Sequence, residues 1–128
     1  MKKPSRNKRS PAKRNADDGY HCHGRAWIEG KDGTFLGYGR VVLLERIRDH
    51  GSISKAAISM EMSYKHAWDL IDSMNRQAKN PLVEKVSGGR GGGGTQLTEA
   101  GEQAIDAFWS LHARLEKFLA EETKKLEF

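Results

Sequence analysis

The sequence predicts a mainly α-helical fold with a small amount of β-structure, and two observations carry most of that prediction. Residues 52–71 contain two helical patterns separated by a tight turn, and the second pattern opens on polar residues. Further along, the segment 87–95 is rich in glycine and lies between two strand-like pieces. A helix pair followed by a glycine-rich hairpin is typical of a winged helix-turn-helix, in which the hairpin is the wing.

Length and composition predict one domain without a membrane span. The chain has 128 residues, of which 37% are hydrophobic and 30% are charged, enough for one modest core. It has no apolar run of membrane-spanning length, and its basic N-terminus lacks the apolar stretch of a secretory signal. The single cysteine, Cys22, excludes an internal disulfide and fits a reducing environment. We therefore expect a cytoplasmic protein that does not enter a membrane.

The formal net charge of +5 is unevenly distributed. Residues 1–24 hold seven basic and two acidic side chains and few apolar ones, which predicts a disordered basic tail that touches phosphates non-specifically or simply stays in solvent. Residues 40–96 hold nine basic and six acidic side chains, whereas residues 97–128 hold four and seven. The positive half of the predicted domain therefore contains the helix-turn-helix and the glycine loop, and can attract a polyanion.

The predicted domain, residues 25–128, begins with a β-hairpin. Two short aromatic-rich runs, at 25–29 and 34–36, flank a loop that is bounded by glycines. Residues 40–50 then show the spacing of a helix, and Gly51 follows as a natural C-terminal stop.

The helix-turn-helix itself is predicted from its capping residues and from its polar first turn. Ser52 is expected to cap the second helix and Ser63 the third. The first turn of the third helix offers a phenol, an ammonium and an imidazole, which can contact bases or phosphates in the major groove. The helix should point one apolar stripe inward, consisting of Ala67, Ile71 and Met74. Trp68 is interpreted as a partly buried support for the surface that faces DNA.

The wing is predicted from residues 82–86, a strand, and residues 95–97, the returning strand. The loop between them holds six of the fourteen glycines, with Arg90 as almost its sole side chain. Such a loop can follow a narrow surface and present one guanidinium to a minor groove. A flexible hairpin turn without a binding role is the plainer alternative. A phosphate loop of a nucleotide hydrolase is excluded, because no Lys-Ser/Thr pair and helix follow the glycines.

A long final helix is predicted over residues 98–125, with Thr98 as its cap. Its apolar stripe is broader and longer than one small domain needs, which predicts pairing with a second copy of the chain. The residues expected at this homodimer interface are Ile105, Phe108, Trp109, Leu111, His112, Leu115, Phe118 and Leu119.

No group of residues predicts catalysis or a resident metal ion. Asp69 and Asp72 share a helix face, but nothing in the sequence indicates a pocket around them. His21, Cys22 and His23 adjoin one another, whereas tetrahedral sites usually space their ligands by two to four residues and need a fourth from elsewhere. We therefore expect no enzyme, no metal site and no cofactor.

Several segments together resemble the N-terminal DNA-binding domain of ModE-type molybdate-responsive regulators, and most of all its short, single-domain members. The segments that carry the resemblance are 51–54, 62–69, 74–75, 81–84 and 88–94. Residues 97–101 are also similar to the strand-to-helix junction of LysR-type winged helices. The resemblance covers roughly residues 25–120.

The resemblance implies a transcription regulator that dimerises through its long helix and binds a palindromic operator in double-stranded DNA. It implies that the first turn of the third helix enters the major groove, that the second helix faces the backbone, and that Arg90 lies on the wing. The expected DNA-binding residues are Ser52, Ser54, Lys55, Ser63, Tyr64, Lys65, His66, Trp68, Asp69 and Arg90. Molybdate or metal-ion homeostasis is the process that the resemblance links to this regulator.

One departure from the family concerns the effector. Full-length ModE-type regulators carry C-terminal oxyanion-binding domains, whereas this sequence stops at Phe128, directly after the long helix. Instead of sensing molybdate through such a domain, the protein is expected either to act constitutively or to use a separate effector-binding partner.

Two functions from other classes fit the same residues. In the first, backbone N–H groups of the glycine loop or a dimer cleft bind molybdate, tungstate or phosphate, so that the protein is an oxyanion sensor. In the second, the wing and the long helix dock another regulator, so that the protein is an interaction module without sequence preference on DNA. Molybdate binding and sequence preference on DNA distinguish these two from the DNA-binding regulator.

Overall fold

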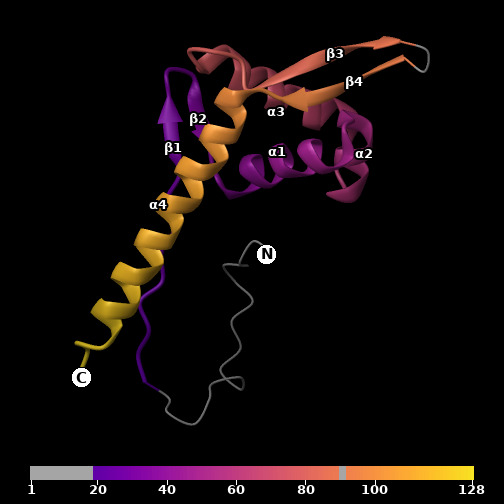
Figure 1. Ribbon diagram of the computed structural model, residues 1–128. Helices are drawn as coiled ribbons and strands as arrows, with labels where there is room; N and C mark the ends of the chain where they lie inside the picture. The colour runs from indigo at the N-terminus through magenta and orange to yellow at the C-terminus, as the bar shows by residue number, and fades with distance from the viewer. Residues whose placement is uncertain (1–18, 90–91) are drawn as a thin grey trace.

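The computed structural model describes residues 19–89 and 92–128 (Figure 1). Its elements are β1 (Ile28–Gly30), β2 (Gly33–Leu36), α1 (Tyr38–His50), α2 (Ile53–Ser59), α3 (Tyr64–Gln77), β3 (Val83–Gly89), β4 (Gly92–Leu97) and α4 (Glu99–Thr123). Strands β1 and β2 form one antiparallel hairpin and β3 and β4 form another. This arrangement confirms the predicted winged helix-turn-helix, with α2 and α3 as the helix pair and β3–β4 as the wing.

The core lies where α1 meets α2, α3 and the beginning of α4. The predicted inward stripe of α3 is buried, which confirms its orientation. In α2, Ala56 and Ala57 are also buried, and their small side chains allow α1 and α3 to approach closely. Four side chains of α1 have no exposed surface, namely Val41, Leu43, Leu44 and Ile47. Removing these apolar side chains from water is the main source of stability of the domain.

Capping residues set the bounds of the helix pair as predicted. The hydroxyl oxygen of Ser52 accepts a hydrogen bond from the backbone N–H of Lys55 at 3.1 Å, and that of Ser63 accepts one from His66 at 3.0 Å. Gly51 ends α1 in the left-handed conformation, with φ of 68°. Each cap satisfies a backbone group that the helix leaves unpaired, so the caps fix where α1 ends and where α2 and α3 begin.

The hairpin bounds differ from the prediction. β1 begins at Ile28, three residues later than predicted, and the wing strands continue into the glycine run as far as Gly89 and from Gly92. Glycine has a low β-propensity, so a run of glycines does not predict a strand, although the backbone of such a run can still form the hydrogen bonds of a β-ladder. Arg90 lies outside the described residues, and so does the predicted tail as far as residue 18.

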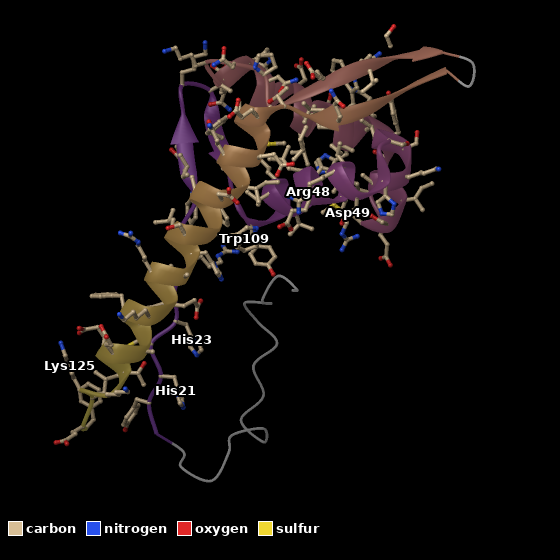
Figure 2. The ribbon with its side chains drawn as sticks, viewed as in Figure 1. His21, His23, Arg48, Asp49, Trp109 and Lys125 are labelled. Carbon is tan, nitrogen blue, oxygen red and sulfur yellow. The ribbon has the colours of Figure 1, made fainter. Side chains whose placement is uncertain are left out.

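Helix α4 extends well beyond the core, on the side away from the wing (Figure 1). Thr98 caps its beginning, and its three buried residues, Gly101, Ile105 and Phe108, lie in its first half. Residues 19–27 run beside the projecting half, where Figure 2 shows His21 and His23. The backbone N–H of Cys22 donates a hydrogen bond to Thr123 Oγ1 at 2.8 Å. This hydrogen bond attaches residues 19–24, which the sequence predicted to be part of a disordered tail, to the end of α4. No helix in the described part of the chain is both long and apolar enough to cross a membrane.

Candidate nucleic-acid interface

The first turn of α3 forms an exposed polar surface at the position that the sequence predicted for base contacts. Tyr64 is 52% exposed, the Lys65 side chain is 82% exposed, and His66 is exposed as well. Ser63 precedes them with its hydroxyl oxygen engaged in the cap, which leaves its hydroxyl hydrogen to donate to a ligand. Because the opposite face of α3 is buried in the core, the helix presents this turn rigidly.

The lysine of this turn forms an exposed ion pair. Lys65 Nζ lies 3.2 Å from both carboxylate oxygens of Asp69, one helical turn later. A solvent-exposed pair of this kind contributes little free energy, so the ammonium can exchange Asp69 for a phosphate or a base at small cost. Trp68, between them in sequence, is 43% exposed and so retains surface for a partner.

A groove joins this turn to the N-terminus of α2 and to the root of the wing. It is lined by Ser52, Ser54 and Tyr64 from the helices and by Lys85, Ser87 and Thr95 from the wing. Lys85 is the one charged side chain among the described residues of the lining, so no carboxylate of that lining repels a phosphate. Lys55 lies nearby, exposed in the first turn of α2. The groove therefore suits a polyanion.

Lys85 is a residue that the sequence analysis missed. It is exposed on β3, opposite Thr95 of β4. Side chains alternate between the two faces of a strand, so a sequence pattern does not tell which face meets the helix pair until the hairpin is placed. The basic residue in the predicted strand was the available signal.

The amide of Asn75 fixes the wing to α3. Its Oδ1 accepts hydrogen bonds from the backbone N–H groups of Leu82 at 2.8 Å and Val83 at 3.2 Å, and its Nδ2 donates to the carbonyl of Val83 at 3.0 Å. These bonds span seven and eight residues of sequence and satisfy backbone groups at the beginning of β3. They set the distance between the wing root and the helix that carries the predicted base-contacting turn.

A second attachment of the wing root joins β4 to the end of α1. The backbone N–H of Thr95 donates a hydrogen bond to the carbonyl of Gly51 at 3.0 Å. A Cβ atom at the neighbouring Gly94 would lie 2.8 Å from the same carbonyl oxygen. The last glycine of the run is therefore required for close approach, and the wing root is held at two places.

The predicted dimer residues of α4 divide into two groups. Ile105 and Phe108 are only 3% and 1% exposed, so they belong to the core of this chain, which corrects their assignment to a dimer interface. Trp109 Nε1 donates a hydrogen bond to Glu45 of α1 at 2.8 Å (Figure 2), and His112 lies against aromatic rings of its own chain. The remaining residues keep surface for a partner, with Leu111 and Phe118 exposed and Leu115 and Leu119 half-buried.

The histidines near the N-terminus do not form a metal site with other described residues. The rings of His21 and His23 are 6.5 Å apart, and among the described residues no three His, Cys, Asp or Glu side chains are grouped closely enough to hold a metal ion.

The polar start of α3, the groove free of described acidic residues and the projecting hairpin define a winged helix-turn-helix of the DNA-binding class. The family model described as bacterial regulatory helix-turn-helix protein, lysR family, matches residues 39–102, half of the chain. The chain belongs to this family, whose members are transcription regulators rather than enzymes.

Similar proteins confirm the resemblance to ModE-type regulators. The chain is 45% identical over 94 residues to the molybdenum transport protein ModE of Azotobacter vinelandii, covering 73% of this chain and 35% of that protein. It is 41% identical over 110 residues to the molybdenum-pterin-binding protein MopB of Rhodobacter capsulatus, covering 86% and 40%. It is 45% identical over 69 residues to the DNA-binding transcriptional dual regulator ModE of Escherichia coli (strain K12), covering 54% and 26%. The chain thus spans well under half the length of these curated relatives.

Proposed function

We propose that this chain binds double-stranded DNA in a sequence-specific manner, as a homodimer, and regulates transcription in connection with molybdate. The observation that carries the proposal is the groove that joins the exposed polar first turn of α3 to the N-terminus of α2 and the root of the wing. No catalytic role is included, because the exposed polar residues of this surface suit contacts with DNA and are not gathered around a reacting centre.

Two kinds of contact follow from this surface. Lys55 is exposed in the first turn of α2 and Lys85 is exposed in the lining of the groove. Both suit phosphates, which gives affinity that falls with salt but no sequence preference. Tyr64, Lys65 and His66 stand at the helix start that enters the major groove, where they reach base edges. Ser52, Ser54, Ser63, Trp68 and Asp69 border these contacts. Arg90 lies outside the described residues and is proposed as a further DNA contact from its place in the sequence.

The homodimer is proposed to form on the projecting half of α4. Leu111 and Phe118 are exposed by 36% and 56%, and Leu115 and Leu119 lie on the same stripe. Pairing of two such stripes removes apolar surface from water. It also places two α3 helices on one face of the DNA, about 34 Å apart, which matches one turn of the duplex.

The link to molybdate rests on the names of the relatives, which include molybdenum transport and molybdenum-pterin-binding proteins. The process that this chain controls is proposed to belong to the same area of metabolism.

Selection from a randomised duplex pool at two salt concentrations tests the proposal. We expect the purified protein to enrich a two-fold symmetric sequence whose half-sites lie one turn apart, with retention that falls at the higher salt concentration. Retention without any enriched sequence, abolished by modest salt, would contradict sequence-specific binding.

Size-exclusion chromatography with light scattering tests the dimer. The double variant Leu111→Asp with Phe118→Asp should run as a monomer with an unchanged helical circular dichroism spectrum, because both positions are exposed in the single chain. Ala113→Asp, exposed on the opposite side of α4, is the matched control and should remain dimeric. A dimeric double variant would exclude this half of α4 as the interface.

A further inference from the structure

The face of α3 that points away from the core carries two ion pairs. With about 3.6 residues per helical turn, this face presents Lys65, Asp69, Asp72 and Arg76, opposite the buried stripe. Lys65 pairs with Asp69, and Arg76 pairs with Asp72, in each case one turn apart. The face therefore offers carboxylates as well as cations to whatever it contacts.

The two pairs differ in how firmly their charges are held. Asp72 accepts a hydrogen bond from Arg76 Nε at 3.0 Å, and Nη1 of the same guanidinium donates to Asp32 of the first hairpin at 3.2 Å. This pair is therefore fixed to a second element. Asp69, by contrast, has Lys65 as its partner among the described residues, and the Lys65 side chain is 82% exposed. The Lys65–Asp69 pair can turn to a ligand at small cost.

A carboxylate on this face restricts what the face can recognise. The phosphates of DNA are negatively charged, so Asp69 repels the backbone and gains nothing from contact with it. The groups that suit a carboxylate in the major groove are the amino groups of cytosine and adenine. An ammonium suits the acceptors, of which guanine offers two, O6 and N7. The charges of Lys65 and Asp69 are thus complementary to base edges.

The spacing of this pair matches the edge of one base pair. In a G·C pair, guanine O6 accepts a hydrogen bond from cytosine N4, so these two atoms lie about 2.9 Å apart. O6 keeps a lone pair and N4 keeps a second hydrogen, and both face the major groove. The Lys65 ammonium and the Asp69 carboxylate are 3.2 Å apart, so together they can meet this acceptor and this donor.

The other base pairs fit these two side chains less well. An inverted C·G pair exchanges acceptor and donor, so the ammonium faces an amino group and the carboxylate faces a carbonyl oxygen. A T·A pair keeps the order of acceptor and donor, but it has the thymine methyl group where guanine has its second acceptor, N7. An A·T pair inverts that order.

We propose that Lys65 and Asp69 act as one unit that selects a G·C pair in each half of the operator. The ammonium binds guanine O6 and N7, and the carboxylate accepts the exposed N4 hydrogen of cytosine. This assignment rests on the proposed function, because it requires α3 to enter the major groove. It gives Asp69 a role in specificity, since the carboxylate disfavours the inverted pair.

Parallel selections from one randomised duplex pool test the assignment. The wild-type protein, Lys65→Ala, Asp69→Ala and the matched control Asp72→Ala are selected under the same conditions. We expect a G·C preference at one position of each half-site, which Lys65→Ala and Asp69→Ala both relax by about tenfold. Asp72→Ala should keep it, because Arg76 holds that carboxylate. Relaxation of different positions by the two variants, or of none by Asp69→Ala, would overturn the proposal.

Binding to a scrambled duplex separates base recognition from damage to the fold. Asp69 is 51% exposed, so Asp69→Ala should change the melting temperature little. The variant removes a negative charge near phosphates, so we expect affinity for the scrambled duplex to stay the same or rise. Affinity for the operator should fall about tenfold. An equal fall on both duplexes would make Asp69 a structural residue and contradict the assignment.

The wild-type selection also distinguishes a failure of this assignment from a failure of the proposed function. If no sequence is enriched, sequence-specific binding fails and the assignment fails with it. If an operator is enriched but no half-site position prefers G·C over C·G and T·A, the assignment alone fails.

An operator with N4-methylcytosine at the selected G·C position tests the carboxylate contact itself. The methyl group replaces the N4 hydrogen that faces the major groove and leaves the pairing with guanine in place. We expect the wild-type protein to bind this duplex about tenfold more weakly than the unmodified operator, and Asp69→Ala to bind both equally. Equal binding of the two duplexes by the wild-type protein would show that Asp69 only positions Lys65, which would overturn the proposal.

Discussion

The two hairpins of this protein have the same secondary structure and opposite attachments. The N-terminal hairpin β1–β2 is held against α3 at its turn, where Gln77 accepts a hydrogen bond from the backbone N–H of Asp32 and donates one to the carbonyl of Thr34. The wing β3–β4 is held at its root, by Asn75 and by Gly51, and then projects from the domain (Figure 1). A hairpin anchored at its turn supports α3, the helix that is proposed to contact bases. A hairpin anchored at its root projects from the domain and can contact DNA. The two hairpins therefore differ in their expected roles because of where each is attached to the domain, and not because of their strands.

The largest expected effect on stability comes from removing the hydrogen bonds that attach the wing root to α3. Asn75→Ala removes three hydrogen bonds and leaves two backbone N–H groups and a carbonyl without this partner, so we expect a loss of about 2–4 kcal/mol in the free energy of unfolding. Urea denaturation measures it, and Asn80→Ala, at an exposed amide outside these contacts, should change little. A loss no larger than that of the control would show that Asn75 does not hold the wing.

A smaller effect is expected where β4 meets the end of α1. Gly94→Ala places a methyl group 2.8 Å from the carbonyl oxygen of Gly51, so the strand must shift, at a cost of about 1–2 kcal/mol. Gly39→Ala is the control, because a Cβ atom there meets no atom within 4 Å. Thermal denaturation of the two variants compares them, and equal melting temperatures would refute the close approach.

The smallest effect is expected at the N-terminal hairpin. Gln77→Ala removes the bonds to Asp32 and Thr34 in a partly exposed setting, and we expect a loss of about 1 kcal/mol. If the hairpin is a support, amide hydrogen exchange should accelerate in β1 and β2 while the wing root keeps its protection. Acceleration in the wing instead would invalidate the division between the two hairpins.

Local features were predictable from the sequence, and contacts between distant elements were not. Ser52 and Ser63 cap their helices because a cap depends on neighbours three residues away. The inward stripe of α3 follows from helical periodicity in the same way. The bonds from Gln77 to the first hairpin join residues about 45 positions apart, and no local pattern records them.

The dimer stripe shows a different limit of sequence reasoning. An apolar face identifies residues that leave water, but it does not say whether the chain's own core or a second copy covers them. Ile105 and Phe108 are covered by their own chain, whereas Leu111 and Phe118 are not. Lys85 was missed for a related reason, since its role depends on where the hairpin is placed relative to α2 and α3.

Two lysine variants test whether the first turn of α3 reads bases while the wing root contacts the phosphate backbone of the DNA. Binding of Lys65→Ala and Lys85→Ala to the selected operator and to a scrambled duplex is measured over a series of salt concentrations. We expect Lys65→Ala to lose about 1–3 kcal/mol of binding free energy on the operator and little on the scrambled duplex. We expect Lys85→Ala to lose binding equally on both duplexes and to lower the slope of the salt dependence by about one. Equal losses on both duplexes for Lys65→Ala, or an operator-specific loss for Lys85→Ala, would show that the first turn of α3 and the wing root do not divide base and phosphate contacts in this way.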